Sequence, residues 1–433
     1  MRSHGSFVSR RTLMSTLLGG AALLSAATLP GAAEAQDGKP LAGKSITVLL
    51  PAPGYPAEVI SRFQDETGAK VDQQTLAWDQ LRNRIVTALV AGSAPADVIE
   101  LDWSWVGQFG AAGWLSPLDE PLAKAGLDDM PLAPIFKYDG ATVGAPYNAD
   151  FKLMIYNKDQ LARAGIAKPP QTLDELVAAG KALQEKGVAQ HPLGWPLSVG
   201  EATSTAWFLT TMMFGGDIFD AEGKPAFTDP QSPGYKALAF IKQAVDDGLI
   251  DPASTAYGNP EVREAFKRGD ATFTLSDGPG LLPDVNDPAK SKVAGQAAGG
   301  VVPTVSGQTR SFGLPEALAI PKTSGEQDAA AAFIAFVAEP DAQIASYAQS
   351  GTMPTRTAAI EMLNKDGKLL SGDAILAQLK GVGPLFADGT PAWYPAFSNG
   401  TAGAINQLVK GEITVDQAAK AIAEAADAAK TEN

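Results

Sequence analysis

A carboxylate and two indole rings stand together in Asp102-Trp103-Ser104-Trp105, directly after the strand-like run Asp97–Leu101. A carboxylate accepts hydrogen bonds from hydroxyl groups, and an indole ring covers an apolar face. Asp102 and Trp103 can therefore bind a polar molecule that has C–H faces. An aspartate before a helix can equally serve as its N-cap, so that role for Asp102 stays open. We expect Trp105 and Trp114 to lie in the core.

Thiol and multi-histidine chemistry is excluded by composition. The chain has no cysteine, and its histidines are His4 and His191. Disulfides, thiolate catalysis and thiolate zinc sites are therefore ruled out, and no cofactor is expected. His191 lies in a turn-like His-Pro-Leu-Gly stretch, so we do not expect a catalytic role for it. The many carboxylates leave a two-carboxylate glycoside hydrolase as an alternative.

The N-terminal residues 1–35 have the pattern of an export signal peptide. Arg10 and Arg11 precede an apolar stretch, and an Ala-x-Ala sequence ends at Ala35. The paired arginines favour the twin-arginine route, and the general secretory route is the alternative. We expect a soluble periplasmic protein, because no later stretch offers about 20 unbroken apolar residues.

Charge and length limit the partners and the number of domains. The net charge is −14, and it becomes −16 after loss of a leader with three arginines and one glutamate. This acidity argues against binding to nucleic acid or anionic lipid. Residues 36–433 are long enough for two domains of roughly 100–200 residues each.

Strand and helix patterns alternate through the first third of the chain. Strand-like runs at 45–50, 70–75 and 97–101 are separated by helical patterns at 57–67 and 79–91. This order implies an α/β layer with a mostly parallel sheet. Further on, we expect strands at 271–275 and 316–320, and helices at 173–185, 206–214, 235–247, 261–268, 327–338 and 414–429.

Four ordered stretches resemble one protein family. They are residues 85–119 with Ala-Pro-Ala-Asp-Val and Gly-Trp-Leu-Ser-Pro-Leu-Asp, 145–176 with Ala-Pro-Tyr-Asn, 266–279 with Arg-Gly-Asp-Ala, and 318–356 with Ala-Ile-Pro-Lys and Met-Pro-Thr-Arg. Together they resemble the carbohydrate-type extracellular solute-binding proteins of ABC transporters, the maltose-binding-protein-like group. No single stretch is specific; their order over most of the chain carries the resemblance.

The resemblance implies an α/β fold of two lobes, each with a mostly parallel sheet flanked by helices and with a ligand cleft between them. We expect the first lobe to comprise 36–147 and 278–321, and the second to comprise 148–277 and 322–433. The family further implies a non-enzymatic monomer that binds a neutral saccharide or polyol and delivers it to a membrane ABC permease. The same fold with another cargo, such as a polyamine or a phosphodiester, is an alternative.

The ligand-binding candidates are aromatic, carboxylate and amide side chains placed near strand ends, crossovers or family ligand loops. Besides Asp102 and Trp103, they are Tyr55, Tyr147, Asn148, Trp195, Trp207, Asp277, Trp393 and Tyr394. Trp103 and Trp393 are predicted to come from opposite lobes and to stack on one sugar. Arg310 and Arg356 are expected to be a solvated loop residue and a structural residue. Sugar-binding relatives often place a tryptophan after Asp277-Gly278-Pro279, but this chain has Gly280 there, which leaves room for a different or smaller ligand.

Overall fold

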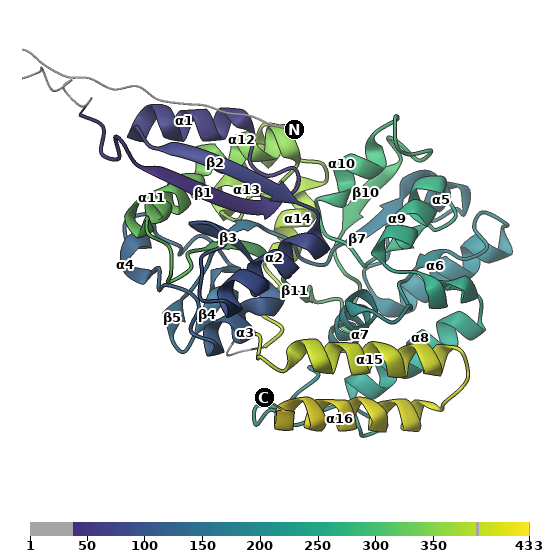
Figure 1. Cartoon of the computed structure of the whole chain (residues 1–433). Helices are drawn as coiled ribbons and strands as arrows, with labels where there is room; N and C mark the ends of the chain where they lie inside the picture. Colours follow the sequence, from purple (N-terminus) through teal and green to yellow (C-terminus); the bar gives the residue numbers. More distant parts are fainter. Residues whose placement is uncertain (1–37, 387–388, 433) are drawn as a thin grey trace, which may run out of the picture. The chain divides into compact units, whose positions relative to one another are not determined.

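The computed structural model describes residues 38–386 and 389–432, so the export signal expected at 1–35 lies outside the described residues. Two sheets organise the rest of the chain, and helices flank both of them (Figure 1). The expected two-lobed α/β architecture is confirmed, with one principal sheet in each lobe.

The first sheet has five strands in the order β2-β1-β3-β12-β6. Strand β1 runs parallel to β2 and β3, whereas β12 is antiparallel to β3 and β6. Continuous apolar sequence explains why Leu49 and Ile99 are fully buried at the centre of the sheet. The bounds are β1 Ser45–Pro51, β2 Lys70–Leu76, β3 Val98–Asp102, β6 Ala145–Asn148 and β12 Glu316–Ala319.

Helix α1 shows how sequence signals position the helices of the first lobe. It follows Pro56, buries Val59 and Phe63, and ends at Gly68, whose φ of 79° is easily adopted only by glycine. Phe63 packs edge-on against Phe333 of α11 at 5.2 Å between ring centroids. The bounds here are α1 Ala57–Thr67, α2 Trp78–Val90, α3 Val106–Ala111, α4 Asp119–Leu122, α11 Gln327–Val337, α12 Pro340–Ser350 and α13 Thr357–Lys365.

The second sheet has four strands in the order β10-β7-β9-β8. Only β8 and β9 are parallel, and β7 is antiparallel to both of its neighbours. In each sheet one strand opposes the others, β12 in the first and β7 in the second, so most strands share one direction as expected. The bounds are β7 Met154–Asn157, β8 Leu193–Gly194, β9 Phe273–Thr274 and β10 Ala297–Gly300; the short pairs are β4 Lys137–Tyr138 with β5 Ala141–Thr142, and β11 Ser311–Phe312 with β13 Val382–Gly383.

Helix α6 of the second lobe begins at the predicted capping box. The amide of Glu175 donates to the Thr172 hydroxyl at 3.2 Å, and the Glu175 carboxylate accepts from the Thr172 amide at 3.1 Å. The C-terminal α15 and α16 pack against α7 and α8. The bounds are α5 Lys158–Arg163, α6 Leu173–Glu185, α7 Glu201–Met213, α8 Pro233–Asp246, α9 Asn259–Arg268, α10 Leu281–Asn286, α14 Gly372–Leu379, α15 Tyr394–Val409 and α16 Val415–Glu432.

Two of the expected lobe boundaries differ from the strand pairing. Strand β10 pairs with β7 of the second sheet, although 278–321 was assigned to the first lobe. Helices α11 and α12, within 322–433, contact α1 of the first lobe, whereas α14 contacts β10 and α15 and α16 contact α7 and α8 of the second. The chain therefore returns to the first sheet at β12, after residue 300 rather than at residue 278.

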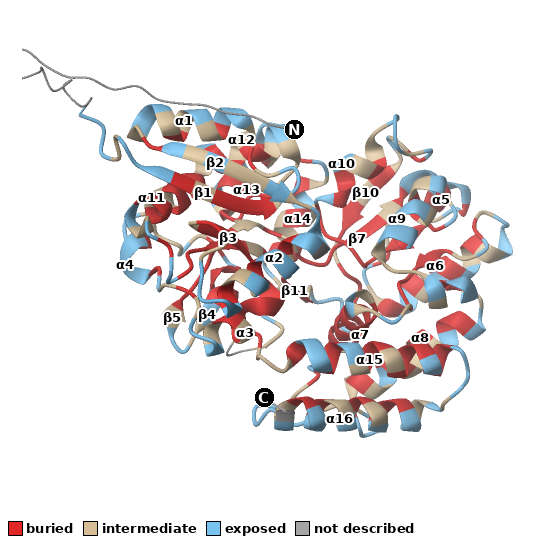
Figure 2. Cartoon of the chain, viewed as in Figure 1, coloured by how far each residue is buried: buried red, intermediate tan, exposed pale blue. Residues whose placement is uncertain are grey.

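Buried residues follow both sheets and the inward faces of the helices, as the red segments of Figure 2 show. Among residues 38–386 and 389–432, no helix is long and apolar enough to cross a membrane. The folding core is therefore built between the sheets and their own helices, which leaves the strand ends free to form a site.

Candidate solute-binding site

A cavity of about 410 Å³ opens where strands β1, β2 and β6 end. Ligands of open α/β sheets characteristically bind at such strand ends. The walls come from the loop after β1, the start of α2, the end of β6 and the turn after α12. The lining residues are Leu50, Pro51, Ala52, Pro53, Gly54, Tyr55, Leu76, Ala77, Trp78, Tyr147, Asn148, Gly280, Glu316, Ser350, Gly351 and Thr352.

One wall of the cavity is a network of carboxyl and tyrosine groups. The Tyr147 hydroxyl lies 2.7 Å from Oε2 of Glu100 and 2.9 Å from Oε2 of Glu316. The Asn148 amide also donates to Oε2 of Glu316, at 3.2 Å. Because a phenol carries one proton, Tyr147 cannot give a full hydrogen bond to both carboxylates at once. The network is therefore short of donors.

The same carboxyl groups have raised pKa values. Burial raises the pKa of Glu100 well above its usual range, and the negative charge of Glu316 raises it further. Burial likewise raises the pKa of Glu316 and of Asp102. The negative charges of Glu201 and Glu316 raise the pKa of Asp102 further. These groups therefore hold protons at a higher pH than ordinary carboxyls.

A pH-dependent stability follows from Glu100. The contribution of Glu100 to stability is complete below the pKa of its carboxyl in the unfolded protein, about 4.3. It is lost as the pH rises through the raised pKa of the same carboxyl in the folded protein. Glu100→Gln should therefore reduce the fall in melting temperature between pH 5 and pH 8. Glu412→Gln, at an exposed position, is the matched control and should leave that fall unchanged. Equal slopes for wild type and Glu100→Gln would contradict the assignment.

A second set of contacting side chains lies where the two lobes meet. Asp102 caps the short 3₁₀ turn Trp103–Trp105, and its Oδ1 accepts from the Ser104 amide at 2.8 Å. The Trp103 ring lies 4.9 Å from that of Tyr394, whose hydroxyl donates to Glu201 at 2.8 Å. The N-cap role left open for Asp102 is thus the one observed. Strand β3 of the first lobe and helices α7 and α15 of the second meet here.

The connections between the sheets carry a separate ion cluster. Asp277 pairs with Arg263, with Nε at 2.7 Å and Nη2 at 2.5 Å from Oδ1. The buried Lys152 ammonium donates to the Ser276 carbonyl, which ties the connection after β6 to the one after β9. A Cβ atom at Gly278 would collide with Oδ1 of Asp150, so glycine is required for the two segments to approach.

The predicted residues separate into groups. Tyr55, Tyr147 and Asn148 line the cavity, although Asn148 also accepts from the Met353 amide at 3.1 Å. Asp102, Trp103 and Tyr394 form the neighbouring group, whereas Asp277 belongs to the ion cluster.

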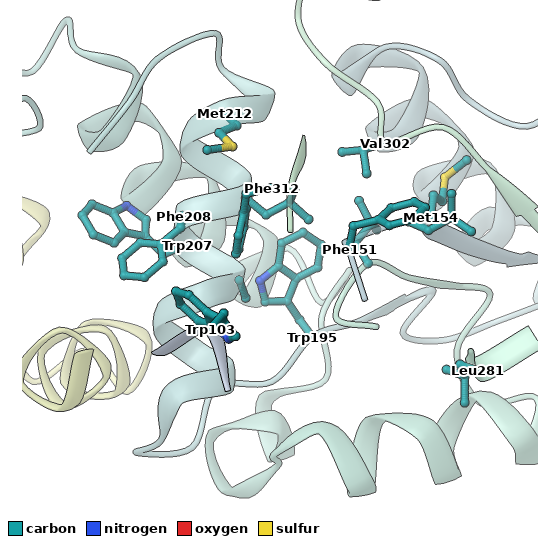
Figure 3. Packing of buried hydrophobic residues seen from close by; sticks show 14 of the residues in the cluster. Trp103, Phe151, Met154, Trp195, Trp207, Phe208, Met212, Leu281, Val302 and Phe312 are labelled. Atoms are coloured by element: carbon teal, nitrogen blue, oxygen red, sulfur yellow. The ribbon is translucent and has the colours of Figure 1, made fainter. Parts of the chain in front are cut away.

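The remaining predicted tryptophans lie away from the cavity lining. Trp207 is fully buried in α7, and its Nε1 donates to the Gly234 carbonyl at 3.0 Å. Trp393 packs against Phe219, and the Lys430 ammonium lies 5.1 Å from its ring centroid. Trp195 is 2% exposed, and its Nε1 has no hydrogen-bond partner among the described residues. Figure 3 shows Trp103, Trp195 and Trp207 among the packed side chains.

Sequence reasoning missed three residues of the site. Trp78 is 39% exposed, lines the cavity and stacks on Trp105 at 5.3 Å between centroids. Glu100 and Glu316 form the acidic wall. Glu100 could have been found from the sequence, because it is a charged residue within the otherwise apolar strand β3. A buried carboxyl needs a partner, so its presence there indicates a polar site. Gly280 lines the cavity where a tryptophan is missing, and Trp78 provides an indole ring instead.

The structural role expected for Arg356 is observed, whereas Arg310, expected to be a solvated loop residue, forms an ion pair. Arg356 donates to the carbonyl groups of Ala125 and Gly126, each at 2.8 Å. Arg310 pairs with Asp217 at 2.5 Å, and Nδ1 of His191 lies 2.7 Å from the Gly248 carbonyl oxygen. In the part of the chain that the structure describes, no three His, Cys, Asp or Glu side chains are grouped to hold a metal ion.

Comparisons with known proteins agree with this geometry. Residues 50–344 match the family model of the bacterial extracellular solute-binding proteins. The sn-glycerol-3-phosphate-binding periplasmic protein UgpB of Agrobacterium fabrum is 26% identical over 313 residues, 67% of this chain and 68% of the relative.

Two solved solute-binding proteins of ABC transporters share the fold. That of Thermotoga lettingae, bound to α-D-tagatose, has a TM-score of 0.77, 24% identity and coverage of 89% and 99% of the two chains. That of Agrobacterium radiobacter K84, bound to ribitol, has a TM-score of 0.76, 22% identity and coverage of 91% and 100%. The chain therefore belongs to the family of bacterial extracellular solute-binding proteins.

Proposed function

We propose that this protein is a periplasmic receptor that captures a saccharide or polyol and delivers it to a membrane ABC permease. The observation that carries the proposal is the lining of the cavity. Tyr55 and Trp78 offer aromatic surface for C–H faces, while Asn148 and Glu316 offer acceptors for hydroxyl groups. The tagatose and ribitol complexes of the structural relatives support this solute class.

A phosphate ester is a poorer fit, although one relative is named for glycerol phosphate. None of the residues that line the cavity is lysine or arginine. Recognition of phosphate in a site of this kind generally uses Arg or Lys donors. The charge of the wall thus favours a solute without a phosphate group.

The site also supports a receptor that carries out no chemistry. A glycoside hydrolase needs two carboxyl groups that flank a glycosidic bond. Glu100 is fully buried behind Tyr147 and cannot flank a substrate bond. We propose that the protein acts as a monomer, without a cofactor and without binding nucleic acid.

A thermal-shift screen over sugars and polyols tests the proposal, with X-ray scattering on each hit. A true ligand at a hundredfold excess over its Kd should stabilise the protein by about 2.7 kcal/mol and so raise the melting temperature. Two-lobed binding proteins commonly close around a ligand by hinge motion, so the radius of gyration should shrink when the ligand is saturating. A panel without any stabilising sugar or polyol would contradict the proposed solute class.

A further inference from the structure

No described residue pairs a cation with the acidic wall of the cavity, which Glu100 and Glu316 form around the Tyr147 hydroxyl. The charges that raise the pKa of Glu100 are those of Glu316 and Asp102, and the charge of Asp150 raises that of Glu316. Asp102 adjoins Glu201 of α7, which approaches from the second lobe. Three buried or partly buried cations nearby have other partners: Lys152 donates to the Ser276 carbonyl, Arg263 pairs with Asp277, and Arg82 donates to Gln108. Lys152 acts on Glu201 at a distance, but not on the wall itself.

The wall also has polar atoms without hydrogen-bond partners. Both hydrogen bonds to Glu316 fall on Oε2, and no described residue donates to Oε1. Oε1 of Glu100 and the Tyr55 hydroxyl are buried without a partner among the described residues, and Tyr55 lines the cavity and is 7% exposed. Buried polar groups in native proteins are nearly always hydrogen-bonded, so a polar solute group is expected to complete this wall.

We propose that the solute carries a protonated amino group, held in the cavity against the carboxyl group of Glu316. The inference rests on the proposed function and narrows the solute to amino sugars or amino polyols, in place of the neutral solute expected from sequence. An ammonium supplies three donors and a positive charge, whereas a hydroxyl supplies one donor. The rings of Tyr55 and Trp78, on the same cavity, add favourable faces for a cation.

The free oxygen of Glu316 makes this selection strong. Its Oε1 accepts no hydrogen bond from a described residue, so an ammonium can pair with it directly and stabilise the ionised form of the carboxyl. A charge-assisted hydrogen bond is roughly twice as strong as a neutral one, and it strengthens where water is excluded. A neutral hydroxyl in the same position would leave the carboxyl charge uncompensated.

Calorimetry on matched sets of compounds tests the inference. Each set contains an amine, its hydroxyl parent and its N-acetyl derivative: D-glucosamine with D-glucose, D-galactosamine with D-galactose, and 1-amino-1-deoxy-D-sorbitol with D-sorbitol. In the set that binds most tightly at pH 7, the amine should have an affinity at least about tenfold higher than its hydroxyl parent and its N-acetyl derivative. A difference of this size corresponds to one charge-assisted hydrogen bond. Added salt should weaken binding of the amine more than that of the parent.

The variant Glu316→Gln should reduce the amine-to-parent affinity ratio to about threefold or less, since the shape is kept and the charge is removed. Glu412→Gln, which removes an exposed charge far from the wall in sequence, should keep the wild-type ratio. A melting curve for each variant confirms folding. If parents bind and amines bind no better, the inference is wrong and the proposed function stands. If no compound of any set binds, both are wrong.

Discussion

Trp78→Ala is expected to weaken solute binding ten- to hundredfold with little loss of stability. The Trp78 ring lines the cavity and is 39% exposed, so it is available to a solute and contributes little to the core. Loss of the ring area that covers a sugar face corresponds to on the order of 1–3 kcal/mol. Calorimetric titration beside a melting curve gives both quantities for each variant.

Trp393→Ala is the matched control for that experiment. Its ring packs against Phe219, Phe386 and Phe397, away from the residues that line the cavity. We expect this variant to lose stability and to keep its affinity, and Trp78→Phe to recover part of the binding. If Trp78→Ala binds like wild type while Trp393→Ala binds weakly, the site lies nearer the position first predicted from the sequence.

Arg356→Met is expected to destabilise the fold by about 3–5 kcal/mol, the usual cost of removing one partner of a buried charge network. The side chain is 7% exposed, pairs with Asp129 and donates to the carbonyl groups of Ala125, Gly126 and Ala338. A methionine fills the space but leaves these acceptors without donors. Urea unfolding of the purified protein measures the change.

The exposed pair of Arg310 and Asp217 provides the comparison. Surface ion pairs contribute about 0–1 kcal/mol, so Arg310→Met should lie within that range of wild type. Arg356→Lys separates charge from geometry, because a lysine cannot present the forked set of donors. A free energy of unfolding for Arg356→Met within 1 kcal/mol of wild type would show that the network is not what holds α13 to the first lobe.

The local elements of this protein were predictable because their signals are local. The apolar run at 45–50, the capping box of Thr172 and Glu175, and the glycine at 68 each specify a strand, a helix start or a helix end by short-range sterics and hydrogen bonds. The order of these elements, with the family resemblance, predicted two α/β lobes. The strand pairing departs from the lobe boundary expected at residue 278, because strand β10 has the weak sequence Ala-Ala-Gly-Gly and takes its partner from far along the chain.

The site depended on pairings that only the tertiary structure decided. Strand β12 places Glu316 beside Asn148 and Asp102, each more than 160 residues earlier, and so completes the acidic wall. No local pattern specifies such a partner, because strand pairing is chosen by packing over the whole sheet. Tyr55, Tyr147 and Asn148 were predicted to be near the ligand because strand ends and crossovers can be recognised in the sequence.

The neighbours Trp393 and Tyr394 show the same division between sequence and structure. The sequence indicated only that an aromatic pair near the C-terminus matches a family ligand position. In the structure the pair stands at the start of a helix, where successive residues point about 100° apart. Tyr394 therefore contacts Trp103 and Glu201 of the junction between the lobes, whereas Trp393 lies among phenylalanines beneath Lys430. The residue types were fixed by the chain itself, and the direction in which each ring points was decided by the packing of α15 against α7 and α16.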